Sequence, residues 1–507
     1  MRGSNSKAEF LALVTFLIGA TLVLTNGFSS RIFAQNDDQA IFDHIDPIGE
    51  VLSEILQNYV YEPNLDDTVE GAIKGMMNSL DPNSSFIPPE GFRDMREDTA
   101  GEFEGIGISI QLIDGNVIVA QPMPDQPAAK AGLRSGDFIV EVDGVPMLDI
   151  YSDTMTRREA LGKISSRIKG PRGTVVGLTI SRAVKVDDAS EEDDASEEDD
   201  AGEEDEAGEE DEAGEEDEAR ETLDFDIERG KIPLKSILEA RLLDGGIAYI
   251  RVSDFKKNTA SDLRKRLRRF EDEGMKSLVL DLRWNPGGLL NASREVCELF
   301  LPKSTLVVST RGKERSPGKY TEEMELFTEK RPVIPETMPV VLLVNEFSAS
   351  SSEIVTGALQ FHQRALIVGA KTFGKGSVQT IIPLARPKGS AIRITTALYY
   401  TPANVTINHV GILPDVEVAM VRDDQDSLLQ QMMTSYQADI SLRDKQDHGR
   451  VTGNMAEDAV QDVVLERAVE IIREDAVFSN LIQKYHRDVR ETQVAASDSH
   501  VASPDGE

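Results

Sequence analysis

Apolar residues change their spacing several times along the chain, and each change predicts a different kind of structure. Between about residues 40 and 95 they recur at helical spacing, as in "TVEGAIKGMMNSL", which predicts an N-terminal helical region. From residue 99 to residue 186, short alternating runs are separated by Gly, Pro and Asp, with brief helical segments at "PAAKAGL" and "TRREALGKISSRI". This second stretch predicts a compact β-rich module.

From residue 222 the pattern alternates between buried strands and amphipathic helices. "KSLVLDLR", "MPVVLLVN" and "RALIVGA" are apolar runs of strand length, and helical segments such as "ASSSEIVTGALQFH" separate them. This β-α-β order predicts a parallel-rich α/β core over residues 222–420, with helices that cover the sheet. We expect a C-terminal helical region over residues 421–485 and a disordered polar tail over residues 486–507.

The formal net charge of −36 comes largely from one segment. Residues 187–218 hold 22 acidic side chains and no basic one, in hexads such as "DDASEE" and "DEAGEE", so the rest of the chain carries −14, the difference between −36 and −22. Repeats this rich in like charge cannot bury a core, so we predict a disordered insertion over residues 187–219. An acidic surface repels phosphate backbones, and nucleic acid is therefore not expected as a partner.

The first 35 residues have the pattern of an export signal or a membrane anchor. Arg2 and Lys7 precede an apolar run from Phe10 to Leu24, which is shorter than the roughly 20 residues that span a bilayer. We expect export to the periplasm or to the extracytoplasmic face of the cytoplasmic membrane. A signal-peptidase cut after Ala34 would place Ile32 where a small residue is preferred, so membrane anchoring through an uncleaved N-terminus stays open.

Four serines, Ser348 and Ser350 to Ser352, lie within five residues, directly after the apolar run "PVVLLV". A strand that leads straight into a helix places such side chains at the edge of a sheet, beside free helix N–H groups that can bind an oxyanion. The pattern alone is compatible with a helix cap and with a nucleophile. The one cysteine, Cys297, lies in a helical pattern, and we expect it to be a buried, unreactive core residue.

A serine nucleophile needs a proton acceptor, and the sequence offers histidine and lysine candidates. His362 follows Ser350 by twelve residues at the far end of the same predicted helix, about 18 Å away, which is too far. His409 in "TINHVGILPD" stays possible. Lys371 and Lys375 occupy the glycine-flanked turn "KTFGKGSVQT", where apolar surroundings such as Phe373 would lower the pKa of a lysine enough to make it a base.

Several of these motifs together resemble the carboxyl-terminal processing (tail-specific) proteases of serine peptidase family S41. "GEFEGIGISI", "DLRWNPGGLL", "VNEFSASSSEIVTGALQ", "GAKTFGKGSVQT" and "GILPDVEV" occur in the family's order and spacing. The resemblance covers about residues 41–418 apart from the acidic insertion. It implies a crotonase-like α/β protease core with an inserted β-rich PDZ domain, at residues 99–186, and a serine–lysine dyad.

The resemblance also implies a role for individual residues. Ser350 matches the nucleophile, Lys375 matches the general base, and Gln379 matches the residue that orients the lysine in many members. The oxyanion hole would be formed by Gly287, Gly288 and the backbone N–H of Ser351. This sequence departs from the family at two positions, because Phe347 stands where glycine is usual and Phe361 stands where many relatives have an aspartate.

The PDZ resemblance implies that the enzyme recognises the C-terminus of its substrate. A PDZ domain binds a peptide as an added strand and captures the terminal carboxylate with backbone amides. The matching loop and strand start comprise Gly105, Ile106, Gly107 and Ile108. The expected partners are therefore proteins or peptides with free C-termini, and a homo-oligomer stays possible. A dyad of this kind requires no metal, nucleotide or other cofactor.

These features predict a serine endopeptidase that processes or degrades proteins from their C-terminal tails. Two alternatives stay open from the sequence. One is a catalytically silent PDZ adaptor, which the joint presence of Ser350, Lys375 and Gln379 disfavours. The other is a serine–histidine hydrolase that uses His409.

Overall fold

The computed structural model of the chain describes residues 43–152, 155–184, 220–316, 319–321, 323–443, 460–474 and 478. The chain divides into two compact units, residues 1–86 and residues 87–507, which we describe separately. The predictions for segment 1–35, for the acidic insertion and for the tail after residue 486 fall outside the described residues. None of the helices within the described ranges is long and apolar enough to cross a membrane.

The first unit is helical where it is described, as its pattern predicts. Residues 43–58 are helical, and α2 (Leu65–Asn78) follows after a short turn. The side chain of Asn64 caps α2 by accepting hydrogen bonds from the backbone N–H groups of Asp66 and Asp67. The short strand β1 (Ser85–Ile87) spans the boundary between the two units.

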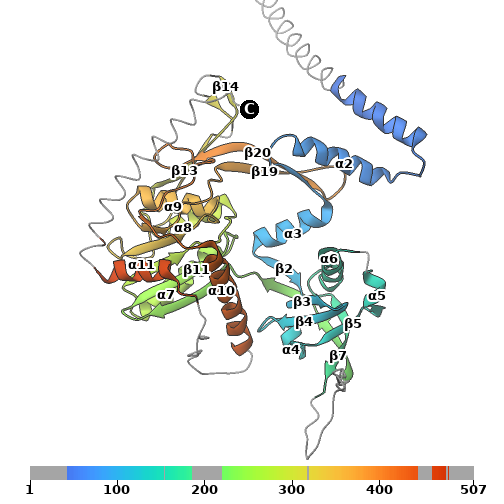
Figure 1. The fold of residues 1–507 in the computed structure, drawn as a ribbon, viewed down its shortest axis with the longest axis horizontal. Coiled ribbons are helices and arrows are strands. Elements are labelled where there is room, and N and C mark those ends of the chain that lie inside the picture. The colour runs from blue at the N-terminus through green and yellow to red at the C-terminus, as the bar shows by residue number, and fades with distance from the viewer. Residues whose placement is uncertain are drawn as a thin grey trace, which may run out of the picture. The chain divides into compact units, whose positions relative to one another are not determined.

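The β-rich module in the second unit is built on an antiparallel sheet with strand order β3-β4-β5-β7-β8, and β6 pairs with β5 (Figure 1). Alternate residues of these strands, such as Val117, Val119 and Leu178, are buried in one apolar core, against which α6 packs Ile164. A capping box between Thr156 and Glu159 starts α6. The elements are β3 (Ile108–Ile113), β4 (Asn116–Pro122), α4 (Pro127–Ala131), β5 (Phe138–Val142), β6 (Val145–Pro146), α5 (Met147–Ile150), α6 (Arg157–Ile168), β7 (Val175–Ala183) and β8 (Arg220–Glu228).

Strand β8 lies after the acidic insertion yet belongs to the sheet of this module. It pairs with β7 along its whole length, from Val175 opposite Glu228 to Ala183 opposite Arg220. The hydrophobic pattern instead predicted that the protease core begins at residue 222. The acidic insertion therefore connects two paired strands of one hairpin. The helix α3 (Pro89–Ala100) precedes the module, and a two-stranded ladder of β2 (Glu102–Gly105) and β9 (Gly230–Pro233) joins its two ends.

The core of the second unit is a six-stranded sheet with order β10-β11-β12-β17-β18-β21, parallel except for the first pair. Its strands bury side chains on both faces. Ala248 and Ile250 of β11 face the cluster formed with α7, α8 and α9, whereas Tyr249 faces the cluster formed with α11. The elements are β10 (Ile237–Leu243), β11 (Ile247–Val252), α7 (Thr259–Asp272), β12 (Ser277–Asp281), α8 (Leu290–Cys297), β17 (Val340–Val344), α9 (Ser351–Phe361), β18 (Leu366–Gly369), β21 (Val416–Glu417) and α11 (Val463–Arg473).

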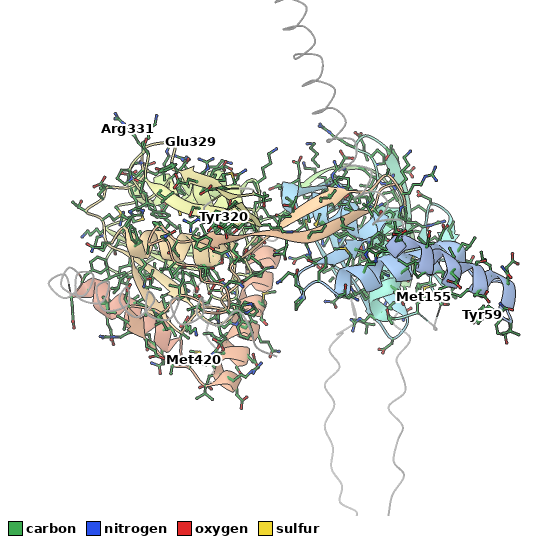
Figure 2. The ribbon with its side chains drawn as sticks, turned by 90° about the horizontal axis from the view of Figure 1, so that it is seen from above. Tyr59, Met155, Tyr320, Glu329, Arg331 and Met420 are labelled. Carbon is green, nitrogen blue, oxygen red and sulfur yellow. The ribbon has the colours of Figure 1, made fainter. Side chains whose placement is uncertain are left out.

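A second antiparallel sheet of the unit contains β16, β13, β20 and β19 in that order. In the loop after β16, Glu329 and Arg331 are exposed and project from the surface (Figure 2). The remaining elements are β13 (Leu306–Gly312), β14 (Glu314–Ser316), β15 (Lys319–Tyr320), β16 (Met324–Phe327), β19 (Ser377–Pro383), β20 (Ala391–Tyr400) and α10 (Arg422–Arg443). The structure thus confirms the prediction of a parallel-rich α/β core combined with an antiparallel β-rich module and helical segments.

Candidate active site

The structure distinguishes Ser350 from the other serines after β17. The hydroxyl of Ser348 donates to the carbonyl of Leu282, that of Ser351 to Gly288 and that of Ser352 to Asn285, at 2.8, 3.0 and 2.8 Å. The hydroxyl of Ser350 donates to no described residue, and this residue is only partly buried. Three of the four hydroxyls therefore stabilise the fold by donating to backbone carbonyls, whereas the hydroxyl of Ser350 does not and could give up its proton in a reaction.

Ser350 adopts a backbone conformation that is unusual for a residue with a side chain. It lies directly before α9 with φ 55° and ψ −114°. Such conformations cost roughly 1–3 kcal/mol and persist only where the surroundings hold them. The sequence predicts a strand that leads directly into a helix at this point, and the structure shows that the connection is a strained turn centred on this serine.

Glu353 connects the Ser350 turn to the Lys375 turn. Its carboxylate is fully buried in the first turn of α9. Oε2 accepts hydrogen bonds from the backbone N–H groups of Ser350 and Lys375, at 2.8 and 2.9 Å. Oε1 accepts from the Thr372 hydroxyl and the Gly374 N–H, at 2.6 and 2.7 Å. Burial raises the pKa of Glu353, and these four hydrogen bonds oppose that shift.

Lys375 is the better buried of the two candidate lysines, since Lys371 is exposed. Burial is the main cause that lowers the pKa of Lys375, the nearby charge of Arg393 lowers it further, and the charge of Glu353 opposes both. A lowered pKa is the property that a lysine base requires. Phe373, which we expected to shield the lysine, is 64% exposed, so most of its surface faces solvent.

The structure also shows the surroundings of Gln379, of the two core histidines and of Cys297. The side-chain amide of Gln379 donates to the hydroxyl of Ser377 at 2.8 Å, and its role in orienting Lys375 stays a prediction. His362 caps the far end of α9 and binds the carbonyl of Leu306 through Nε2. The side chain of His409 is exposed, and its backbone N–H donates to the carbonyl of Gly374 at 2.8 Å. Cys297 is buried, as predicted, and burial raises the pKa of its thiol.

The "NPGG" turn lies directly against the Ser350 turn. Gly287 has φ 102°, and a Cβ atom there would come within 2.8 Å of Cβ of Ser350 and of the backbone N of Ser351. At Gly288, with φ 150°, a Cβ would come within 2.3 Å of the carbonyl oxygen of Phe255. Only glycine therefore fits at these two positions, and the turn can approach the nucleophile closely because both side chains are absent.

Asn285 holds this turn in place. Its side-chain amide donates to the carbonyl of Val252 at 2.8 Å, and its Oδ1 accepts from the N–H of Gly287 at 2.9 Å. Its own carbonyl accepts from the N–H of Ala349 at 3.0 Å. Hydrogen bonds among the described residues leave the N–H groups of Gly288 and Ser351 unused. These two groups can bind an oxyanion, whereas the N–H of Gly287 is occupied.

The predicted peptide-binding loop lies at the start of β3 in the β-rich module. Gly105 ends β2, and Ile106 is buried, so its side chain anchors the loop. The carbonyls of Ile106 and Gly107 accept hydrogen bonds from Ala128 and Met123 within the module, at 2.9 and 2.8 Å. Strand β3 begins at Ile108 and, among the strands within the described ranges, pairs with β4 alone, so its other edge has no strand partner there. The four predicted residues, which are consecutive in the sequence, thus lead into the edge strand of the described sheet, and their role in peptide binding stays a prediction.

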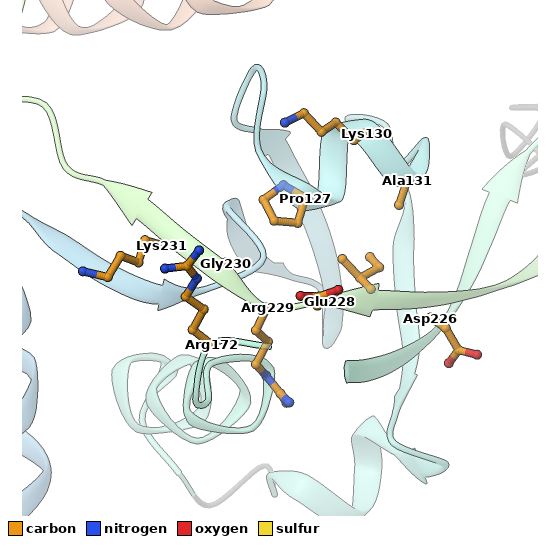
Figure 3. A pocket seen from close by; sticks show the side chains of 10 residues that line it. Pro127, Lys130, Ala131, Arg172, Asp226, Glu228, Arg229, Gly230 and Lys231 are labelled. Atoms are coloured by element: carbon orange, nitrogen blue, oxygen red, sulfur yellow. The ribbon is translucent and has the colours of Figure 1, made fainter. Parts of the chain in front are cut away.

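Two concave surfaces among the described residues are relevant to ligand binding. The first belongs to the β-rich module (Figure 3), where side chains of both charges, including Lys130, Asp226 and Glu228, surround it. The guanidinium of Arg229, which also lines it, donates four hydrogen bonds, three to carbonyls and one to the hydroxyl of Thr174. The second is a cavity between the segments that carry Ser350 and Lys375. It is lined by Glu346, Phe347, Lys371, Thr372, Phe373 and Arg422.

Sequence reasoning missed Glu353, Thr372 and Asn285 as parts of this arrangement. A signal was present for Glu353, because a serine followed three residues later by glutamate is the pattern of a helix capping box. Nothing in the pattern indicated that the same carboxylate also binds the Lys375 turn. That contact depends on how α9 and the turn after β18 pack together.

Comparisons with known proteins agree on one family. Peptidase family S41 matches residues 246–418, and the PDZ domain matches residues 118–182. A carboxy-terminal-processing protease of Bartonella bacilliformis is 32% identical over 474 residues, which cover 92% of the chain and 96% of that relative. The carboxy-terminal processing protease CtpA of Bacillus subtilis is 29% identical over 82% of the chain and 77% of its own length. The solved photosystem II D1 C-terminal processing protease is 26% identical, with a TM-score of 0.38 over 77% of the chain and 91% of its own.

Proposed function

The chain belongs to peptidase family S41 and is a carboxy-terminal-processing serine protease, and on that premise we propose that Ser350 is its nucleophile and Lys375 its general base. The observation that carries this assignment is the shared carboxylate of Glu353, which fixes the backbones of both residues against each other. Replacement of either side chain by alanine tests it, because each change should abolish proteolysis in a protein that still folds.

The reaction begins with a proton transfer. Neutral Lys375 accepts the proton of the Ser350 hydroxyl, and the serine oxygen attacks the carbonyl carbon of the scissile peptide bond. Burial lowers the pKa of the lysine and so increases the fraction of enzyme that carries a neutral amine. Protonated Lys375 then gives its proton to the leaving amine, and water hydrolyses the acyl-enzyme by the same route in reverse.

The tetrahedral intermediate carries a negative oxygen that needs donors at fixed positions. The N–H groups of Gly288 and Ser351 supply them, since no described acceptor uses either group. The hydroxyl of Ser351 donates to the carbonyl of Gly288 and ties the two donors together. Gly287 contributes by its lack of a side chain, because a Cβ there would meet Ser350. Removal of one such donor typically costs about 10²–10³ in kcat.

The substrate's C-terminal segment binds the β-rich module. The free edge of β3 accepts it as an added strand, and the backbone amides of residues 105–108 bind the terminal carboxylate. The left-handed backbone at Gly107, with φ 78°, supports this role because it turns the chain sharply just before β3. Substrates are thus proteins with free C-termini, selected by the module and cut at Ser350.

The apolar side chain next to the scissile bond packs against the cavity between the two catalytic segments. Phe347 and Phe373 supply its apolar surface, and the backbone N–H of Phe373 donates to the carbonyl of Ser348 at 3.1 Å. Phe347, which occupies a position where the family usually has glycine, lines this cavity with a bulky side chain. Replacement of Phe347 by glycine should therefore broaden the range of residues accepted beside the cleaved bond.

Export places the enzyme on the extracytoplasmic side of the membrane. The support is the apolar run from Phe10 to Leu24 behind a basic N-terminus. Fractionation of cells that express the full chain, with N-terminal sequencing of the product, tests both the location and the choice between a cleaved signal and a retained anchor.

A further inference from the structure

The carbonyl groups of Ser350 and Lys375 share a partner, as their N–H groups do. The hydroxyl of Tyr399 donates to the carbonyl oxygen of Ser350 at 3.1 Å and also lies within hydrogen-bond distance of the carbonyl oxygen of Lys375. Tyr399 is 2% exposed. This contact crosses from β20, in the second antiparallel sheet, to the edge of the parallel core sheet.

Tyr399 is itself fixed by the sheet to which it belongs. Its backbone N–H donates to the carbonyl of Gly376 at 2.8 Å, and it lies opposite Thr310 in the pairing of β20 with β13. Tyr399 is thus held on one side by β13, which carries neither proposed catalytic residue, and on the other by the residue that directly follows Lys375. The pairing with β13 gives its hydroxyl an anchor outside the two catalytic segments.

The strained backbone of Ser350 requires restraints of this kind. A residue with φ 55° and ψ −114° relaxes unless its peptide groups are restrained on both sides. Glu353 restrains the N–H of Ser350, and Tyr399 restrains its carbonyl together with the N–H of Ile354, which donates to the same oxygen at 3.0 Å. The same two side chains restrain the N–H and the carbonyl of Lys375.

We propose that Tyr399 is a positioning residue, whose hydroxyl holds the backbones of the nucleophile and the base at the separation that proton transfer requires. This inference rests on the proposed roles of Ser350 and Lys375 and adds a third residue that touches neither substrate nor the transferred proton. Burial and the nearby charge of Glu353 raise the pKa of Tyr399 well above its usual value, so the hydroxyl keeps its proton throughout the working range.

The test compares Tyr399→Phe with a matched control elsewhere in the core. Tyr249→Phe is suitable because Tyr249 is equally buried and its hydroxyl donates to Asp281 at 2.8 Å, on the face of the sheet covered by α11. Both changes delete one buried hydroxyl, which contacts two carbonyls at Tyr399 and one carboxylate at Tyr249. Thermal unfolding of both variants is measured, and their activities are compared at a temperature at which both are folded, so that a loss of stability is not taken for a loss of activity.

The expected result for Tyr399→Phe is a fall in kcat of about 10- to 100-fold, with KM for an unstructured protein substrate changed by no more than about threefold. The pH midpoint of kcat/KM should also move upward. Without the hydroxyl, water must satisfy the Lys375 carbonyl, and hydration of the lysine reverses the burial that lowers its pKa, while Arg393 and Glu353 stay in place. Tyr249→Phe should keep the wild-type kcat and midpoint.

Two results would overturn the inference. One is a Tyr399→Phe enzyme with wild-type kcat and pH midpoint. The other is a fall in activity that matches the fall for Tyr249→Phe and leaves the midpoint unchanged, which would make Tyr399 an ordinary core residue. Ser350→Ala, measured alongside, separates this inference from the proposed function. If that variant is active the dyad itself is wrong, whereas if it is inactive and Tyr399→Phe is normal only the positioning role fails.

Discussion

The backbone N–H groups of Ser350 and Lys375 donate to the same atom, the Oε2 oxygen of Glu353, over 2.8 and 2.9 Å. The two residues are twenty-five positions apart and lie on either side of strand β18, so the sequence alone does not bring them together. The buried carboxylate of Glu353 accepts a hydrogen bond from each of the two backbones, so the folded structure fixes the distance between them. Three of its four hydrogen-bond partners are backbone N–H groups, which can only donate, and the fourth is the Thr372 hydroxyl.

The first prediction concerns this carboxylate. Glu353→Gln should lower kcat by about 10- to 100-fold, because the amide NH₂ would face donors and leave buried N–H groups without an acceptor. Initial rates on an unstructured protein substrate measure the effect. Glu325→Gln, at an exposed position of β16, removes the same charge and should leave the rate unchanged. Equal rates for both variants would show that the shared carboxylate does not organise the site.

The second prediction concerns pH. Lys375 must be neutral to act as a base, and burial lowers its pKa. The neutral fraction grows as pH rises, so kcat/KM should increase with pH through a midpoint below the ordinary lysine value of about 10.4. Lys375→Arg should be inactive from pH 5 to pH 10, because a guanidinium does not lose its proton in this range. A flat wild-type profile, or an active arginine variant, would exclude the lysine as the base.

Much of this arrangement could be predicted from the sequence, because it depends on local pattern. The continuous apolar runs predicted the buried parallel strands, and the apolar stretch before Ser350 predicted a strand that leads into a helix. The choice among the four serines could not be predicted from spacing. It depends on which hydroxyls find carbonyl acceptors, and those belong to Leu282, Asn285 and Gly288, more than sixty residues earlier.

The pairing partner of strand β8 could not be predicted from the sequence either. Its alternating apolar residues predicted a strand, but alternation does not identify the neighbouring strand in a sheet. The pairing with β7 follows from the shared burial of Leu178 and Ile227 in the core of the β-rich module. Tyr399 was missed for a related reason, because a buried tyrosine in a strand pattern gives no indication of what its hydroxyl meets.

The third prediction concerns the acidic insertion. Ala183 and Arg220 face each other across the hairpin, so replacing residues 184–219 by a short Gly/Ser turn should preserve folding and peptidase activity. Thermal unfolding and cleavage of a neutral substrate test this. The replacement should also reduce the preference for basic over acidic substrates at low salt, because 22 negative charges are removed. Loss of folding or of all activity would show that the insertion is structural.

The fourth prediction concerns recognition of the C-terminus. A substrate with a free, apolar C-terminus should be cut faster than the same chain amidated there. In Gly107→Ala this difference should shrink, because a Cβ there would lie 2.6 Å from Cβ of Gln126 and distort the loop before β3. Gly144→Ala is the control, since Gly144 has φ 70° but open space around it. Equal cleavage of the free and amidated chains by the wild-type enzyme would remove the carboxylate-binding role.

The most direct test of the account is the rate at which Ser350→Ala and Lys375→Ala cleave an unstructured protein with a defined C-terminus. The variants Ser348→Ala, Ser352→Ala and His409→Ala are measured in the same assay, after thermal unfolding has shown that each is folded. We expect no detectable cleavage by the first two, measurable cleavage by Ser348→Ala and Ser352→Ala, and a normal rate for His409→Ala. Full activity in Lys375→Ala, or loss of activity in a folded His409→Ala, would contradict the serine–lysine dyad.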